Sequence, residues 1–171
     1  MKEVHYVPQA RDRYMTNRHI AAILFNIATL LDIAQDNVYR LRAYRRAARR
    51  ILALPEDATA IVARGEELPL PGVGERLRRK LAELISTGSL NFYDELLEEV
   101  PLPVRTLMAL DGIGPKIAQR LHAELGISTA RDLIAAAERG KIREIYGFGT
   151  RSEVKLARAA RSAAGGLPDV A

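Results

Sequence analysis

Cysteine is absent from this chain of 171 residues. Its absence excludes disulfide bonds and thiolate metal sites, and it fits a reducing compartment. No apolar run approaches the length that spans a bilayer, and the N-terminal segment MKEVHYVPQARDRY lacks the apolar region of a signal peptide. We therefore expect a cytoplasmic protein without a membrane partner.

Lysine is also scarce. Of the 26 basic residues, 21 are arginines and only five are lysines, namely Lys2, Lys80, Lys116, Lys141 and Lys155. The formal net charge is +5, which favours a polyanionic partner such as nucleic acid or an anionic membrane surface. In a chain that uses arginine for most positive charges, each lysine is a candidate for chemistry that arginine cannot perform.

No segment shows the alternation of a β-strand, whereas apolar residues recur at three- and four-residue steps along most of the chain. The sequence therefore predicts an all-α fold. The first expected helix covers Asn17 to about Leu31, and a second helix, capped by Asp36 or Asn37, runs to about Leu54. The next expected helices cover roughly Ala58 to Arg64, Glu75 to Ser86 and about Phe92 to Glu99. Further helices are expected near Val104 to Leu110, Pro115 to Leu125, Thr129 to Arg139 and Arg151 to Ala163.

Two prolines in the stretch Val100-Pro101-Leu102-Pro103 interrupt helix and stiffen the chain, so we place a domain boundary there. The prediction is a polar N-terminal arm at 1–15, a first small helical domain at 16–100, a second at 101–163 and a frayed tail at 164–171. The starting Met1 and the tapering tail favour a stand-alone protein over a fragment.

A Gly-apolar-Gly turn occurs three times, each time directly before an amphipathic helix. The copies are Gly72-Val73-Gly74, Gly112-Ile113-Gly114 and Gly147-Phe148-Gly149. Glycine lets the backbone approach a ligand closely, and the free N–H groups of the following helix start can bind an anion such as phosphate. Such donors do not distinguish bases. Three copies in a basic chain favour tandem helix-hairpin-helix units that bind DNA, with Lys116 beside the second turn, over turns that merely join packed helices.

Arginines line one face of the second predicted helix, at Arg42, Arg45, Arg46, Arg49 and Arg50. Leu41, Tyr44, Ala48, Ile51 and Leu52 form a separate apolar stripe. A solvated face usually mixes charges, yet no acidic residue lies between Asn37 and Leu54. The pattern favours contact of Arg45, Arg46 and Arg49 with DNA phosphates over an ordinary solvated surface.

Lys80 follows the first turn, one helical turn beyond Arg76 and close to Arg78 and Arg79. A lysine crowded by guanidinium groups has a lowered pKa, because a like charge disfavours its protonated form, and a neutral amine can attack an aldehyde. The alternative is an exposed helix lysine without a chemical task.

The residues from Asn17 to about Glu153 resemble the N-terminal part of the X-family DNA polymerases, the DNA polymerase beta type, and especially their bacterial members. The similar stretches, in family order and spacing, are VYRLRAYRRAARRI, LPLPGVGERLRRKLAELISTGSL, LMALDGIGPKIAQRLHAELGI and IYGFGTRSE. In that family this region comprises a small lyase domain and a helical DNA-binding subdomain. The lyase removes a 5′-deoxyribose phosphate through a Schiff base and β-elimination, without a divalent metal.

The resemblance implies that Lys80 is the Schiff-base nucleophile, that Arg40 and Arg76 stand where phosphate-holding lysines occur in the family, and that Tyr44 shapes the pocket. It implies no required cofactor, but it suggests Na⁺ or K⁺ at the two main hairpins. The ligands would be the backbone carbonyls of Leu68, Leu70 and Val73, and of Met108, Leu110 and Ile113.

Two departures from the family matter. Both phosphate-holding positions carry arginine, whereas the nucleophile position keeps lysine, and only a primary amine supports the covalent step. No Asp-x-Asp pair occurs and the only histidines are His5, His19 and His122, so this sequence lacks the family's metal-binding aspartates and the histidine-rich phosphoesterase of bacterial members. Two-metal nucleotidyl transfer needs clustered carboxylates, so we expect no polymerase activity from this chain alone.

Three hypotheses remain. The first is a sequence-independent DNA-binding protein of base-excision repair that acts at gaps, nicks or 5′-phosphate ends, with lyase activity through Lys80. The second is a non-catalytic DNA clamp that positions a separate polymerase or nuclease. The third is a structural helical scaffold whose hairpins bind protein.

Overall fold

The computed structural model describes residues 15–165. Within that range the chain forms helices and no strand, which confirms the all-α prediction. Most of the predicted N-terminal arm and of the tail lies outside the described residues. The α-helices are α1 (Asn17–Ile33), α2 (Val38–Leu52), α3 (Ala58–Ala63), α4 (Glu75–Thr87), α5 (Asn91–Glu98), α6 (Leu102–Met108), α7 (Pro115–Leu125), α8 (Ala130–Glu138) and α9 (Thr150–Ala164), and a 3-10 turn, η2, covers Ile142–Glu144.

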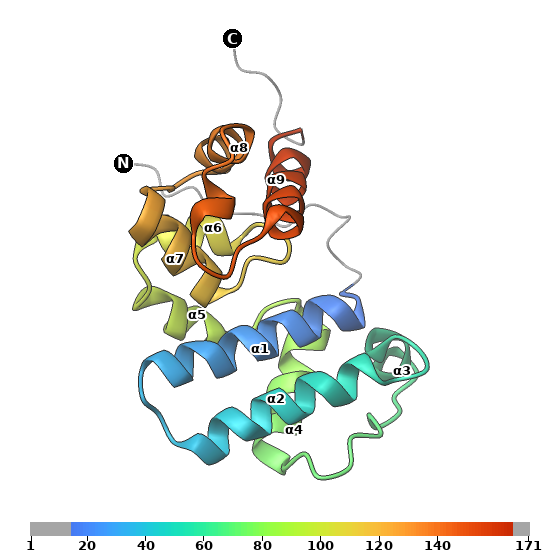
Figure 1. Ribbon diagram of the computed structural model, residues 1–171. Helices are drawn as coiled ribbons and strands as arrows, with labels where there is room; N and C mark the ends of the chain where they lie inside the picture. The colour runs from blue at the N-terminus through green and yellow to red at the C-terminus, as the bar shows by residue number, and fades with distance from the viewer. Residues whose placement is uncertain (1–14, 166–171) are drawn as a thin grey trace, which may run out of the picture. The chain divides into compact units, whose positions relative to one another are not determined.

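The chain divides into two compact units between Glu95 and Leu96, inside α5 and ahead of the proline-rich stretch at 100–103. In the first unit, α1 and α2 lie side by side and run in opposite directions, and α3 packs on α4 (Figure 1). Its core is made of fully buried aliphatic side chains: Ile20, Leu24, Ile27, Ile51, Leu70, Leu81, Leu84 and Leu90.

In the second unit α6 packs on α7, and α8 packs on α9 (Figure 1). Leu107, Leu121, Ile127 and Leu133 are its fully buried large side chains. Thr129 caps α8 as the first residue of a capping box: its hydroxyl accepts the N–H of Asp132, whose carboxylate accepts the N–H of Thr129.

Local sequence signals fix several helix ends. The Asn37 side chain caps α2 by accepting the N–H of Tyr39 at 2.8 Å, and Gly88 ends α4 in the left-handed conformation with φ 78°. The end of α2 was predicted at about Leu54, and α2 ends at Leu52. Pro55 disfavours helical geometry at the residue before it, so the helix stops earlier. Leu52, the last residue of α2, is half-exposed and does not complete the predicted apolar stripe.

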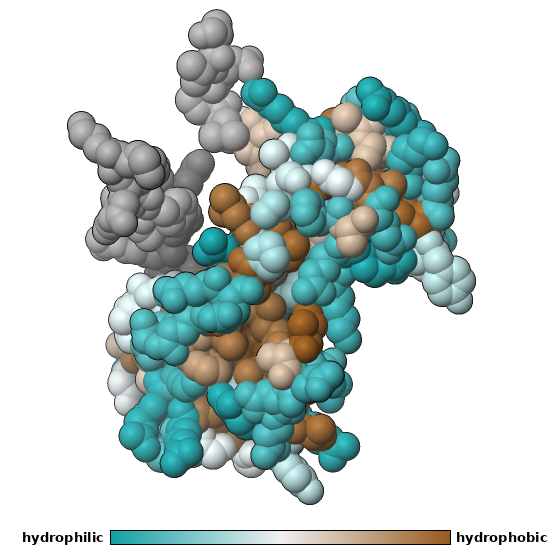
Figure 2. All heavy atoms as spheres, turned by 90° about the vertical axis from the view of Figure 1, so that its left-hand side faces the viewer, coloured by the Kyte–Doolittle hydropathy of each residue, from teal (hydrophilic) through white to brown (hydrophobic). Residues whose placement is uncertain are grey.

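Hydrophilic side chains cover much of the face shown in Figure 2, and apolar atoms appear between them. Among the described helices, none combines the length and the apolar character needed to cross a bilayer.

Candidate nucleic-acid interface

The three Gly-apolar-Gly turns share one backbone geometry. The first glycine of each has a positive φ, 75° at Gly72, 72° at Gly112 and 83° at Gly147. In each turn the middle residue donates its N–H to the carbonyl three residues earlier: Val73 to Leu70 at 3.2 Å, Ile113 to Leu110 at 3.1 Å and Phe148 to Ile145 at 3.0 Å. A left-handed residue is required at the first position, which explains that glycine.

The second glycine of each turn has a different role. Gly74, Gly114 and Gly149 are the N-caps of α4, α7 and α9, and none has a side chain to cap the helix. Gly74 and Gly149 have negative φ, and a Cβ atom at either would meet nothing within 4 Å. Neither backbone strain nor a steric clash therefore requires glycine at these two positions, although glycine is also a better N-cap residue than alanine. The missing side chain also leaves the first-turn N–H groups open to close approach by a ligand.

The middle residue of each turn points back into its unit. Val73 and Ile113 are 7% and 2% exposed. Phe148 is half-buried, and the Arg120 guanidinium lies over its ring with 5.0 Å between Cζ and the centroid. Each hairpin is thus anchored by one apolar side chain.

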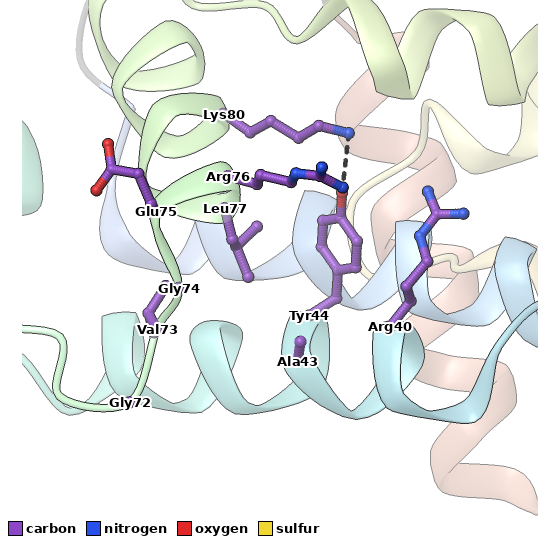
Figure 3. A pocket seen from close by; sticks show the side chains of 10 residues that line it. All are labelled: Arg40, Ala43, Tyr44, Gly72, Val73, Gly74, Glu75, Arg76, Leu77 and Lys80. Atoms are coloured by element: carbon purple, nitrogen blue, oxygen red, sulfur yellow. Dashed lines mark hydrogen bonds between the residues drawn. The ribbon is translucent and has the colours of Figure 1, made fainter.

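A cavity of about 630 Å³ lies between the first hairpin, α2 and α4. Lys80 and Arg76 extend into it from α4, and Tyr44 and Arg40 reach it from α2 (Figure 3). The structure therefore brings together the four residues for which the family resemblance implied lyase roles. The other residues that line the cavity are Ala43, Gly72, Val73, Gly74, Glu75 and Leu77.

The Lys80 amine is held between two aromatic side chains. Its Nζ donates to the Tyr44 hydroxyl at 3.2 Å and lies 3.2 Å from the centroid of the Phe92 ring (Figure 3 shows the hydrogen bond). The Tyr44 and Phe92 rings are stacked with centroids 6.1 Å apart. Phe92, on α5, was not among the predicted site residues.

The pKa of Lys80 is lowered from its ordinary value, first by burial and second by the positive charge of Arg40, while Glu95 and Glu83 oppose the shift. The sequence had predicted the direction from crowding by Arg76, Arg78 and Arg79, and that cause was wrong. Arg78 binds the hairpin instead, and Arg79 is exposed and lies near Glu75.

Tyr44 is buried, and burial raises its pKa to about 12; Arg40 lowers it and Asp36 raises it. The phenol therefore remains protonated at neutral pH. Its oxygen accepts a hydrogen bond from the Lys80 amine, and its own O–H can donate to a polar group in the cavity.

The two arginines of the cavity differ in their partners. Arg40 forms an ion pair with Asp36 at 2.7 Å, and its Cζ lies 5.3 Å from the centroid of Phe92. Arg76 is exposed and forms no ion pair with any residue in the range 15–165. Arg76 is therefore the guanidinium better available to an incoming anion.

The arginine face of α2 is mostly unpaired. Arg45 lies 3.4 Å from Asp32, a weak contact between half-exposed side chains. Four other arginines are exposed and make no ion pair within the described part of the chain: Arg42, Arg46, Arg49 and Arg50. On α7, Lys116 is exposed in the first turn after the second hairpin.

The carbonyls suggested as cation ligands differ between the two hairpins. Leu68, Leu70 and Val73 all accept hydrogen bonds from the Arg78 guanidinium. The corresponding carbonyls of the second hairpin are those of Met108, Leu110 and Ile113, and the residue that corresponds to Arg78 there is Ala118, whose methyl group has no donor.

Two helix-hairpin-helix family models match the parts of the chain that contain these hairpins. Residues 15–90 match the family described as helix-hairpin-helix domain, and residues 104–162 match the SAM-like helix-hairpin-helix tandem. The chain is also 31% identical over 145 residues to the DNA polymerase/3′-5′ exonuclease PolX of Bacillus subtilis (strain 168), covering 85% of this chain and 25% of that relative. This is a tandem helix-hairpin-helix protein similar to the N-terminal region of an X-family DNA polymerase. The chain spans about a quarter of that relative's length.

In this helix-hairpin-helix protein the repeated domains indicate DNA as the partner.

Two residues that contact the site or its hairpin in the structure, Phe92 and Arg78, were not predicted from the sequence as site residues. Phe92 is one of only three phenylalanines, and that scarcity was the one signal that could have marked it. Arg78 was noticed only as a neighbour of Lys80, because its contacts depend on the folded hairpin.

Proposed function

We propose that this chain binds DNA without reading its sequence and removes a 5′-terminal deoxyribose phosphate through a Schiff base on Lys80, as part of DNA repair. The observation that carries the proposal is the Lys80 amine, with a lowered pKa, at a cavity that Arg40 and Arg76 also line. Arginine is the commoner cation of this chain, so a lysine at this point favours covalent chemistry.

Binding rests on the hairpins and on α2. Three helix starts present backbone N–H groups beside glycines, and α2 adds a row of exposed arginines. Both groups of donors suit phosphate oxygens, and contacts to phosphate carry no sequence information. DNA that carries a gap, a nick or a 5′-phosphate is the preferred substrate, because its end can enter the cavity.

The covalent step needs no metal. The neutral Lys80 amine attacks C1′ of the ring-opened sugar aldehyde and, with loss of water, forms an imine. Loss of a proton from C2′ then expels the oxygen on C3′, which breaks the C3′–O bond and leaves a 5′-phosphate on the DNA. Water hydrolyses the imine and restores Lys80. Arg76 and Arg40 hold the sugar's phosphate, and Tyr44 orients the amine.

Nucleotidyl transfer is outside the proposal. No Asp-x-Asp pair occurs among the 171 residues, and clustered carboxylates are what two-metal transfer requires. Residues 1–171 alone are therefore expected not to extend a primer.

A non-catalytic DNA clamp for a separate polymerase or nuclease is the second candidate. The contact of the Lys80 Nζ with the Phe92 ring favours it, because an aromatic face stabilises a charged ammonium. In that case Lys80 only touches phosphate, and Arg would replace it without loss.

Borohydride trapping separates the two candidates. A gapped duplex with a 5′-deoxyribose phosphate is incubated with the protein, borohydride is added, and the amount of covalent protein–DNA adduct is measured. We expect an adduct with the wild type, none with Lys80→Ala or Lys80→Arg, and wild-type amounts with Lys141→Ala, which removes a lysine paired with Glu144.

Lys80→Arg keeps the charge, so its DNA affinity should stay within about twofold of the wild type. Equal trapping by Lys80→Arg would exclude Lys80 as the nucleophile. If the wild type binds the duplex but is not trapped, the lyase is excluded and the non-catalytic clamp is the remaining candidate. Absence of DNA binding would favour the helical scaffold and overturn the proposal as a whole.

A further inference from the structure

The positively charged guanidinium of Arg78 binds the backbone of the first hairpin. Arg78 donates from Nε to the Val73 carbonyl at 3.0 Å, from Nη1 to the Leu68 carbonyl at 3.1 Å and from Nη2 to the Leu70 carbonyl at 2.8 Å. All three nitrogens of one guanidinium are thus bound to three carbonyls that approach and leave the turn. Val73 and Gly74, drawn at the start of α4 in Figure 3, belong to this turn.

These are the three carbonyls for which a monovalent cation was expected. Each carbonyl oxygen has two lone pairs. The Leu68 oxygen accepts the N–H of Leu70 at 2.8 Å, and the Leu70 oxygen accepts the N–H of Val73 at 3.2 Å, each in addition to Arg78. Both lone pairs of these two oxygens are therefore in use, and the donor set does not fit an added Na⁺ or K⁺.

The other two hairpins have different residues at the same position, the fourth after the second glycine. At the second hairpin it is Ala118, which is fully buried and has no polar side chain. At the third it is Glu153, which is 3% exposed and whose carboxylate accepts the backbone N–H of Arg143 at 3.1 Å. Arg78 is therefore a feature of the first hairpin and not of the shared turn geometry.

We infer that Arg78 is a positioning residue whose guanidinium takes the place of a monovalent cation, so that the first hairpin keeps its phosphate-binding shape without Na⁺ or K⁺. A covalently attached cation cannot exchange with the solvent. The first hairpin is thus insensitive to which salt is present. The inference concerns the hairpin alone and holds whether or not Lys80 forms a Schiff base.

Backbone amide NMR of the full chain tests this residue by residue. Potassium chloride replaces tetramethylammonium chloride at constant ionic strength, and the Leu70 and Val73 amide shifts are followed. We expect no saturable change in the wild type and a saturable K⁺-dependent change in Arg78→Ala, where the carbonyls are released. Arg79→Ala is the matched control, because it removes the same charge from an exposed neighbour, and it should behave as the wild type.

A saturable K⁺ response of these amides in the wild type would overturn the inference, because a cation would then compete with the guanidinium. No response in a folded Arg78→Ala would also overturn it, because the carbonyls would then be unable to hold a cation. If Arg78→Ala does not fold, the wild type decides through the side-chain resonances of Arg78. Separate Nη–H signals that K⁺ leaves unchanged support the fixed guanidinium, and averaged signals contradict it.

Discussion

Lys80 is placed where two influences on its charge oppose each other. Burial and the Arg40 guanidinium lower its pKa, whereas the face of Phe92 favours the ammonium. The net direction is downward from the ordinary value of 10.5. A larger fraction of neutral amine is therefore present near neutral pH than for an exposed lysine.

The rate of Schiff-base formation should follow this titration. The rate is expected to rise with pH and to reach a plateau, with the midpoint of the rise below pH 10.5, because only the deprotonated amine attacks. Arg40→Ala removes one of the positive charges, so its midpoint should move to higher pH. Single-turnover adduct formation at saturating protein measures the two profiles. An unchanged pH midpoint in Arg40→Ala would show that Arg40 does not lower the pKa of Lys80.

Glu153 is the one buried charged residue in the described part of the chain. Burial alone would raise the pKa of its carboxyl, but the backbone N–H and the guanidinium of Arg143, with the backbone of Ile142, outweigh burial and the pKa lies below its ordinary value of 4.5. A carboxyl with a lowered pKa in the folded state stabilises the fold above its unfolded pKa and loses that contribution as the pH falls through the folded value.

Glu153→Gln should therefore destabilise the protein at neutral pH by about 1–3 kcal/mol, because the buried carboxylate loses its charge-assisted hydrogen bonds with Arg143. The difference between variant and wild type should shrink as the pH falls below 4.5. Urea unfolding at a series of pH values measures it. A difference that is independent of pH would contradict the assignment of the effect to the ionised carboxylate.

At the scale of the element, the two glycines of one hairpin make opposite predictions. Gly72 has φ 75°, so Gly72→Ala should cost about 1–2 kcal/mol of stability through backbone strain. Gly74 has φ −71° and open space around it, so Gly74→Ala should lower stability only by the weaker N-cap preference of alanine, about 0.5 kcal/mol. The added methyl group should nevertheless weaken DNA binding about tenfold, roughly 1.4 kcal/mol, by keeping phosphate away from the amides.

Thermal melting and DNA titration of the two variants check this pair. Unchanged DNA affinity in a folded Gly74→Ala would show that no ligand approaches the turn. A melting temperature that falls as far in Gly74→Ala as in Gly72→Ala would show that the second glycine serves the fold.

The helices and hairpins could largely be predicted from the sequence, because their signals are local. Asn37 and Gly88 mark helix ends by their own chemistry, and the Gly-apolar-Gly turns reveal their geometry in three residues. The contact of Phe92 with Lys80 and the binding of Arg78 to three carbonyls could not be predicted from the residues alone. Both depend on how side chains from separated segments meet after folding, and neither leaves a periodic pattern.

At the scale of the molecule, exposed arginines are expected to bind the DNA phosphate backbone electrostatically. Arg46 and Arg49 lie on α2, are exposed and make no ion pair within residues 15–165. Each Arg→Ala change at these two positions should weaken binding equally for all base sequences and reduce the slope of log affinity against log salt by about one. Arg64→Ala is the control, because Arg64 is already paired with Glu56 and Glu66. A slope that does not change would remove α2 from the interface.

Fluorescence anisotropy of a labelled, gapped duplex bearing a 5′-phosphate, titrated with the wild-type chain from dilute buffer upward in salt, tests the central claim most directly. We expect tight binding that weakens steeply as the salt concentration rises and that is the same for duplexes of unrelated sequence. Failure to bind gapped or nicked duplexes even at the lowest salt concentration would contradict it.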